Sequence, residues 1–197
     1  MAMKFNESEL KELAQKSKSS IFESSSEILK HASANFDINK KYDIFISHSF
    51  RDAEVIHGLK LFIEKIYSLR VYVDWIDDPE LDRTQVSKYT ANRLRNRMNN
   101  CKTMLVAHSE SSPDSRWVPW EIGYFDSRIG KIAVMPITKG ISNSEKYEGQ
   151  EYLGLYSYGV RGNDKSQRTK IWIQDNPDKY VDLADWVAGK EPFERSA

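Results

Sequence analysis

Short apolar runs alternate with amphipathic segments from residue 41 onward. The runs YDIFIS (42–47), RVYVDW (70–75), TMLVAH (103–108) and IAVMPIT (132–138) are rich in β-branched residues and predict strands. Between them, apolar residues recur at helical spacing over about 52–67, over a stretch with Val86, Leu94 and Met98 inward, and over about 117–129. Strands and helices in alternation predict an α/β fold with a parallel sheet.

Both ends of the chain depart from this alternation. Residues 1–40 contain no Trp, Tyr, Gly or Pro, and they predict a polar helical arm that begins with a capping box of Asn6 and Glu9. A thin apolar stripe (Leu10, Leu13, Ser17, Ile21, Ser24, Ile28) should pack on the domain or on a second copy. At the other end, YLGLYSYGV (152–160) and KIWIQ (170–174) predict extra strands, and DKYVDLADWV (178–187) predicts a closing helix. We therefore divide the chain into an arm (1–40) and one domain (41–197) whose core covers about 41–140.

Charge and composition narrow the class of protein. Lys+Arg and Asp+Glu both number 29, and the absence of a basic half or run argues against binding to nucleic acid or to an anionic membrane. A single cysteine, Cys101, excludes a disulfide framework within the chain. The sequence contains neither a membrane-spanning run nor an apolar signal core, so we expect a cytoplasmic protein.

The candidate chemistry lies where the predicted strands end. In an open parallel sheet, ligands bind beyond the carboxyl ends of the strands. The residues that follow these ends are Ser47–Phe50, Asp74–Asp78 and His108–Ser109, together with the loop entering the helix at 117. We expect these segments to share one rim.

One glutamate stands out at the start of that helix. The core stripe is predicted to be Val118, Ile122, Phe125 and Ile129, and Glu121 falls outside it, beside Trp117, Trp120 and Tyr124. Pro119 is tolerated only in a first turn, which puts Glu121 near the positive end of the helix dipole. An exposed first-turn glutamate is the simpler interpretation. A carboxylate among surplus aromatic rings instead suits a planar ligand on which positive charge develops.

These motifs together resemble a known family. The segments KYDIFISHSFRDAE, VYVDW, CKTMLVAHSESSPDSRWVPWEI and KIAVMPI resemble a bacterial TIR (Toll/interleukin-1 receptor) domain over about residues 41–140. The most specific parts are the first-strand motif and the Ser-x-Trp-x-x-x-Glu entry formed by Ser115, Trp117 and Glu121. The resemblance implies a flavodoxin-like parallel sheet flanked by helices, with an N-terminal helical extension and extra C-terminal strands and a helix.

The resemblance also implies an activity and a site. In the catalytic branch of the family, a glutamate at the position of Glu121 cleaves the nicotinamide–ribose bond of NAD, which is a substrate and not a cofactor. Departure of neutral nicotinamide leaves a cationic ribose, so one carboxylate suffices. By resemblance, or through their place around Glu121, the substrate-binding residues are expected to be Ser47, His48, Phe50, Trp75, Asp77, Asp78, Trp117, Trp120 and Tyr124. No metal is expected.

The product and the partners follow from the same resemblance. Water would yield ADP-ribose, whereas attack by the substrate's own adenine or ribose would yield a cyclic ADP-ribose isomer. The chain resembles stand-alone antiphage proteins of the Thoeris type, which implies self-association and a separate effector that senses the nucleotide. The alternative is a non-catalytic TIR scaffold that acts by self-association or partner-TIR binding.

Two other types of site were weighed. The acidic loop after the second strand (Asp74, Asp77, Asp78, Glu80, Asp82) could bind magnesium, but its carboxylates come from one loop and no phosphate-binding glycine motif accompanies them. We expect most of these side chains to face solvent or to pair with Arg83, Arg93 or Arg95. A serine nucleophile is disfavoured because neighbours such as Ser47 and His48 point to opposite faces of a strand.

Overall fold

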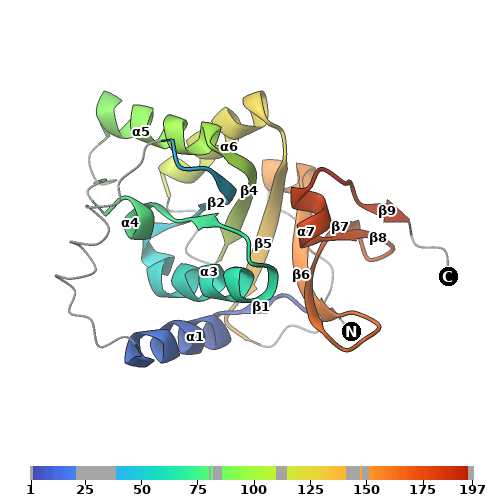
Figure 1. Ribbon diagram of the computed structural model, residues 1–197. Coiled ribbons are helices and arrows are strands. Elements are labelled where there is room, and N and C mark those ends of the chain that lie inside the picture. Colours follow the sequence, from blue (N-terminus) through green and yellow to red (C-terminus); the bar gives the residue numbers. More distant parts are fainter. Residues whose placement is uncertain are drawn as a thin grey trace.

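The central feature of the fold is a sheet of nine strands, seen edge-on between two layers of helices in Figure 1. The structure is a computed structural model that describes residues 2–20, 39–79, 81, 86–109, 115–140, 147 and 151–194, without the side chains of residues 18–20 and Phe50. The helices are α1 (Glu7–Ser20), α3 (Ala53–Tyr67), α4 (Asp74–Asp77), α5 (Lys88–Asn99), α6 (Trp117–Arg128) and α7 (Leu183–Val187), with 3-10 turns η1 (Phe50–Asp52) and η3 (Glu151–Leu155). The strands are β1 (Phe5–Asn6), β2 (Tyr42–Ser47), β3 (Val71–Tyr72), β4 (Cys101–His108), β5 (Ile132–Thr138), β6 (Ser157–Asn163), β7 (Thr169–Asn176), β8 (Lys179–Asp182) and β9 (Phe193–Glu194).

The strand order confirms the predicted flavodoxin-like α/β fold. The sheet runs β3-β2-β4-β5-β6-β7-β8-β9, and its first five strands are parallel. Numbered along the chain, those five have the order 2-1-3-4-5, which is that of flavodoxin-like sheets. The strands β7, β8 and β9 are antiparallel additions at the C-terminal edge. The order of strands reverses between β2 and β4, which is the point where such sheets bind ligands.

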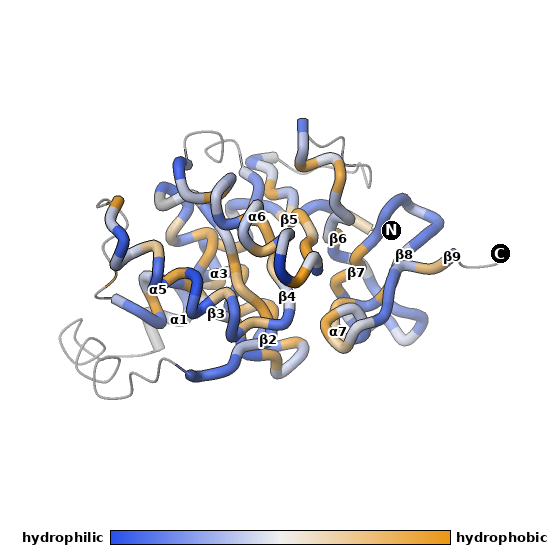
Figure 2. The backbone as a smooth tube through the Cα atoms, turned by 90° about the horizontal axis from the view of Figure 1, so that it is seen from above, coloured by the Kyte–Doolittle hydropathy of each residue, from blue (hydrophilic) through white to orange (hydrophobic). Residues whose placement is uncertain are grey.

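Alternation along the strands gives the sheet two separate apolar faces. Ile44 and Ile46 belong to a core cluster with Val55, Ile56, Leu59 and Ile63 of α3, whereas Phe45 belongs to a second cluster with helices α5 and α6. All six residues of β2 are buried, as expected for a strand covered on both faces. In Figure 2 the hydrophobic colour gathers along β4 and β5 in the middle of the molecule.

The N-terminal segment is part of this core. Asn6 caps α1 as predicted, because its Oδ1 accepts hydrogen bonds from the backbone N–H groups of Ser8 (2.9 Å) and Glu9 (3.2 Å). The Glu9 side chain does not close the predicted box; it pairs with Arg161 at 2.7 Å. Of the predicted stripe, Leu10 is buried against the sheet's α3 side, and positions 21, 24 and 28 lie outside the described residues.

The first residues also complete the sheet. Strands β5 and β6 pair only at Ala133–Ser157 and Val134–Tyr158. Beyond those pairs, β1 runs parallel to the end of β5, while Met3 forms an antiparallel bridge with Arg161 of β6 through two backbone hydrogen bonds of 2.7 Å. The N-terminal strand therefore bonds to the carboxyl halves of both β5 and β6.

Several predicted boundaries are wrong for identifiable reasons. The second strand covers only 71–72, because Asp74 and Trp75 begin α4, where a carboxylate at the helix start is favoured. Val86 was predicted to face the core, but it precedes α5 and is 74% exposed. The helix begins after Ser87, whose side chain accepts a hydrogen bond from the backbone N–H of Thr90. Ile129 follows α6 and is 39% exposed.

The C-terminal elements also differ from prediction. Residues 151–155 form a 3-10 turn before β6 begins at Ser157. The predicted closing helix is half strand, since 179–182 pair with β7 and only 183–187 are helical, capped by Asp182. In the part of the chain that the structure describes, no helix has both the length and the apolar character that a membrane span requires.

A buried ion pair joins the second-strand loop to α5. Asp78 accepts two hydrogen bonds of 2.7 Å from the guanidinium of Arg97, and both side chains are almost fully buried. Tyr72 also donates to Asp78 at 2.8 Å, and burial raises the pKa of Tyr72 well above its usual range, so that its hydroxyl keeps its proton. Arg93 also donates to Asp78, at 3.3 Å, and these three partners satisfy a carboxylate that would be costly to bury alone.

We predict that Asp78→Ala destabilises the fold by about 3–5 kcal/mol, because it leaves the Arg97 charge buried without its partner. Urea denaturation would measure this free energy of unfolding. The exposed Asp178 is the matched control, and Asp178→Ala should change stability by less than about 0.5 kcal/mol. Equal stabilities of the two variants would contradict a structural role for Asp78.

Gly58 permits the close contact between α1 and α3. A Cβ at this position would lie 1.9 Å from the Leu10 carbonyl oxygen, a backbone atom that cannot rotate away. We predict that Gly58→Ala costs about 3 kcal/mol or more of unfolding free energy, by overpacking. Gly123 in α6 has open space around it, so Gly123→Ala should stabilise by up to about 1 kcal/mol, and the reverse order would refute this packing.

Candidate active site

Glu121 lies at the amino end of α6 and is fully buried. Its Oε2 accepts a 2.6 Å hydrogen bond from the hydroxyl of Ser47, the last residue of β2. The sequence predicted that Glu121 lies outside the core and among aromatic rings. This prediction was wrong, because the side chain is buried and contacts Ser47 of the sheet. A hydrogen bond of this length fixes the position of the carboxyl group relative to β2.

The position of this pair in the sheet is informative. Ser47 is the last residue of β2 and is paired with Val106 of the neighbouring strand β4. This pair lies at the point of the sheet where the strand order reverses. Ligands of flavodoxin-like sheets bind outside this point. The structure thus brings the predicted catalytic residue to the predicted rim.

The residues that follow Ser47 turn to the other side of the strand. His48 is buried, its Nδ1 lies 3.1 Å from the Ile46 carbonyl oxygen, and its Nε2 lies 3.5 Å from Asp74 Oδ1. Trp75 packs against the core cluster on the α3 side and makes an edge contact with His57. His48 therefore contacts Asp74 and Trp75 contacts His57, while Ser47 contacts Glu121. The Phe50 side chain lies outside the described residues.

A further contact joins the ends of β2 and β4. Ser109, which follows β4, donates a 2.6 Å hydrogen bond to Asp52 at the start of α3, and both residues are buried. The same motif that predicted the first strand contains Asp52, but nothing local indicated its partner. This bond holds the rim segment that follows β4 to the start of α3.

The acidic loop is used mostly within the fold. Asp74, Asp77 and Asp78 are largely buried instead of facing solvent. Asp78 pairs with Arg93 at 3.3 Å, as predicted, but its closer partner at 2.7 Å is Arg97, which was not predicted. Asp77 accepts from the Tyr42 hydroxyl at 3.1 Å and from the Val73 N–H at 2.9 Å. Substrate contact by Asp77 and Asp78 stays a prediction, while Glu80, Asp82 and Arg83 lie outside the described residues.

The three predicted aromatic residues form a ladder along α6. Trp117 meets Trp120 edge-on at 5.4 Å between ring centroids, and Trp120 stacks on Tyr124 at 6.0 Å. Arg95 of α5 covers Trp120 and Tyr124, with its guanidinium 5.2 and 5.8 Å from their centroids. Arg95 was expected to pair with the acidic loop. Trp120 and Tyr124 therefore join α5 to α6, which leaves Trp117, one turn before Glu121, as the aromatic residue at the helix start.

Two further features bear on what the protein could bind. Among the described residues, no group of three or more His, Cys, Asp or Glu side chains is arranged to hold a metal ion.

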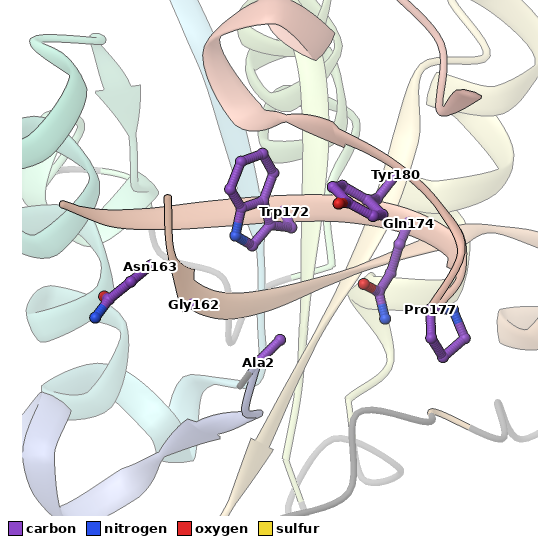
Figure 3. Close-up of a pocket in the computed structure, with 7 residues that line it drawn as sticks. All are labelled: Ala2, Gly162, Asn163, Trp172, Gln174, Pro177 and Tyr180. Carbon is purple, nitrogen blue, oxygen red and sulfur yellow. The ribbon is translucent and has the colours of Figure 1, made fainter. Parts of the chain in front are cut away.

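A separate cavity of about 220 Å³ lies at the antiparallel edge of the sheet, and Figure 3 shows Trp172 and Tyr180 beside it, with Ala2 from the N-terminal segment opposite. The remaining lining residues are Gly162, Asn163, Gln174 and Pro177. None of these residues belongs to the rim around Glu121.

The sequence of this chain is similar to those of known proteins. Residues 45–140 match the family described as Thoeris protein ThsB, TIR-like domain. A "Probable 3′ cyclic ADP-D-ribose synthase ThsB′" of Bacillus cereus (strain MSX-D12) is 51% identical over 162 residues, which are 81% of this chain and 82% of that protein. A "Putative cyclic ADP-D-ribose synthase TIR2" of Cytobacillus dafuensis is 34% identical over 126 residues, 63% of this chain and 31% of the relative.

A solved structure is also similar. The TIR domain of the Toll-related receptor TRR-2 from Hydra magnipapillata is 16% identical, with a TM-score of 0.41, and covers 57% of this chain and 77% of that domain. The relationship rests on sequence: with 51% identity across 81% of its length to ThsB′, the chain belongs to the Thoeris ThsB family of TIR-domain proteins.

Proposed function

We propose that this protein cleaves the nicotinamide–ribose bond of NAD and closes the remaining ADP-ribose into a cyclic nucleotide. The observation that carries the proposal is the buried Glu121 carboxylate, held by Ser47 at the switch point of the sheet. The names of the two relatives, both cyclic ADP-D-ribose synthases, support the same reaction.

The chemistry requires little more than this carboxylate. As the C–N bond breaks, its electron pair goes to the positively charged pyridinium nitrogen, so nicotinamide leaves neutral and needs no general acid. The ribose left behind carries positive charge over its anomeric carbon and ring oxygen. A fixed carboxylate stabilises that charge without reorganising, which is the largest contribution that a preorganised site makes.

Ser47 is a positioning residue in this proposal. Its hydroxyl donates to Oε2 of Glu121 and so fixes the position of the carboxylate that we propose acts on the ribose. Trp117, half-buried at the start of α6, is the aromatic residue that we propose for stacking on the substrate. His48, Phe50, Trp75, Trp120 and Tyr124 remain predicted contacts, with His48 and Trp75 acting through the second-strand loop.

The linkage and the setting are also proposals. We propose that ring closure uses the 3′ hydroxyl of the adenosine ribose, following the printed name of the ThsB′ relative. The product would serve as a signal for a separate effector in Thoeris antiphage defence, and self-association of the TIR domain would accompany activity. In a purified preparation, nicotinamide release that rises more steeply than protein concentration would indicate this self-association.

We predict that Glu121→Gln lowers the rate of nicotinamide release from NAD by at least about 100-fold. Glutamine keeps the shape and can still contact Ser47, but it removes the charge that stabilises the ribose cation. Chromatography with mass detection would measure nicotinamide. Glu12→Gln on the exposed surface of α1 is the control, and equal activity of both variants would exclude the proposed role of Glu121.

We predict that Ser47→Ala lowers kcat by about 10- to 100-fold with little change in KM, because the Glu121 carboxylate loses the hydrogen bond that orients it. Steady-state kinetics with NAD would separate the two constants. Ser127→Ala on the exposed side of α6 should leave both unchanged. A rise in KM alone would instead make Ser47 a substrate-binding residue.

A further inference from the structure

A histidine that the proposed cleavage step does not use lies next to the candidate site. His108 is the last residue of β4, two positions beyond Val106, which pairs with Ser47. Residues two apart on a strand share one face, so His108 lies on the same face as Ser47 and Glu121. From the rise of a strand and the spacing between strands, the Cα atoms of His108 and Ser47 lie about 8 Å apart.

The imidazole has an unused polar atom. Nδ1 of His108 is buried and has no hydrogen-bond partner among the described residues. The ring is held edge-on against Tyr147, with centroids 5.8 Å apart, and Tyr147 in turn packs against Tyr158 of β6 at 5.7 Å. Buried polar atoms without a hydrogen-bond partner are rare in proteins, and a bound ligand can supply the missing partner.

The charge state of these rings suits proton acceptance. Burial lowers the pKa of His108 below its ordinary value near 6.5, so the imidazole is neutral at pH 7. Burial raises the pKa of Tyr147 to about 12, so the neighbouring phenol is neutral as well. A neutral imidazole with its proton on Nε2 presents Nδ1 as an acceptor.

We infer that His108 is the general base for ring closure, whose Nδ1 takes the proton from the ribose hydroxyl that attacks the cation held by Glu121. This inference rests on the proposed function and adds a second catalytic residue to it. Glu121 serves bond cleavage, and His108 serves bond formation. Ring closure through a hydroxyl needs such a base, because the oxygen must lose its proton as it bonds to carbon.

The step balances in atoms and charge. The C–N bond to nicotinamide breaks and its electron pair leaves with nicotinamide. The 3′ oxygen of the adenosine ribose forms a bond to the anomeric carbon, and its proton passes to His108 Nδ1 and then to solvent. NAD thus gives a cyclic ADP-ribose, nicotinamide and one proton, and no oxidant or other co-reactant is required.

The test is the ratio of products formed by His108→Asn. The asparagine Oδ1 can still accept a hydrogen bond near the position of Nδ1, but it is not basic enough to take a proton. We expect nicotinamide release to stay within about threefold of the native rate. The ratio of cyclic product to linear ADP-ribose should fall by about 100-fold, the lower range of what a positioned general base contributes.

A matched control uses the same substitution on the other face of the sheet. His57 lies in α3 and contacts Trp75, and His57→Asn should leave the product ratio unchanged. If the asparagine at 108 impairs folding, judged by the melting temperature, His108→Gln replaces it in the same measurement. Nicotinamide release itself reports that the Glu121 site is intact.

The outcomes separate the two proposals. An undiminished cyclic product from His108→Asn would overturn this inference while leaving NAD cleavage in place, because hydrogen bonding without basicity would then suffice. Loss of nicotinamide release together with cyclisation, in a folded variant, would also overturn it, because His108 would then act in bond cleavage. Absence of nicotinamide release from the native protein would instead refute the proposed function.

Discussion

The alternation of side chains along β2 is the constraint on which the rest of the structure depends. Because β2 lies between β3 and β4 and is covered on both faces, every residue in it must satisfy one of two cores. Phe45 and Ser47 face α5 and α6, while Ile44 and Ile46 face α3. Ser47 therefore meets Glu121 and the next residue, His48, meets Asp74 on the other side. A shift of one residue in the β2–β4 register would exchange these contacts and remove the site.

The buried carboxylates of this protein have two kinds of role, one structural and one that we propose to be catalytic. Asp78 receives hydrogen bonds from Arg97 and Tyr72, and Asp52 receives one from Ser109. Glu121 differs in its position, because Ser47 holds it at the point of the sheet where the strand order reverses, outside which such sheets bind ligands. In the proposed reaction, a carboxylate held there stabilises the positive charge that develops on the substrate. The ion pair of Asp78, in contrast, holds the second-strand loop to α5.

The additions at the two ends of the chain meet at β6, inside the sheet. Met3 and the strand β1 hydrogen bond to β6 and β5, and Glu9 pairs with Arg161 of the same strand. The antiparallel strands β7 and β8 continue the sheet beyond β6, and Trp186 of α7 packs into the core on the α3 side. Residues 2–20 are thus continuous with the domain in packing. This explains how a weak apolar stripe is stable as a helix, since tertiary contacts supply what the segment lacks.

The sequence by itself determined the local elements and the identity of the candidate catalytic residue. Helical spacing found α3 and α6, period and composition found β2, β4 and β5, and Asn6 marked the start of α1, because each of these signals is contained within one segment. Glu121 could be identified from its motif and from its place near the amino end of α6. The TIR resemblance was likewise a property of short motifs in a fixed order.

Only the tertiary structure decided which side chains meet. The burial of Glu121 on Ser47, the choice of Arg97 as partner of Asp78, the bond from Ser109 to Asp52 and the position of His108 beside the site all join segments that are distant in the chain. Local periodicity assigned Ile129 and Val86 to the core, yet both stand beyond helix ends, where helical spacing no longer applies. Strand register and helix docking set these contacts, and both depend on long-range packing that no single window of sequence contains.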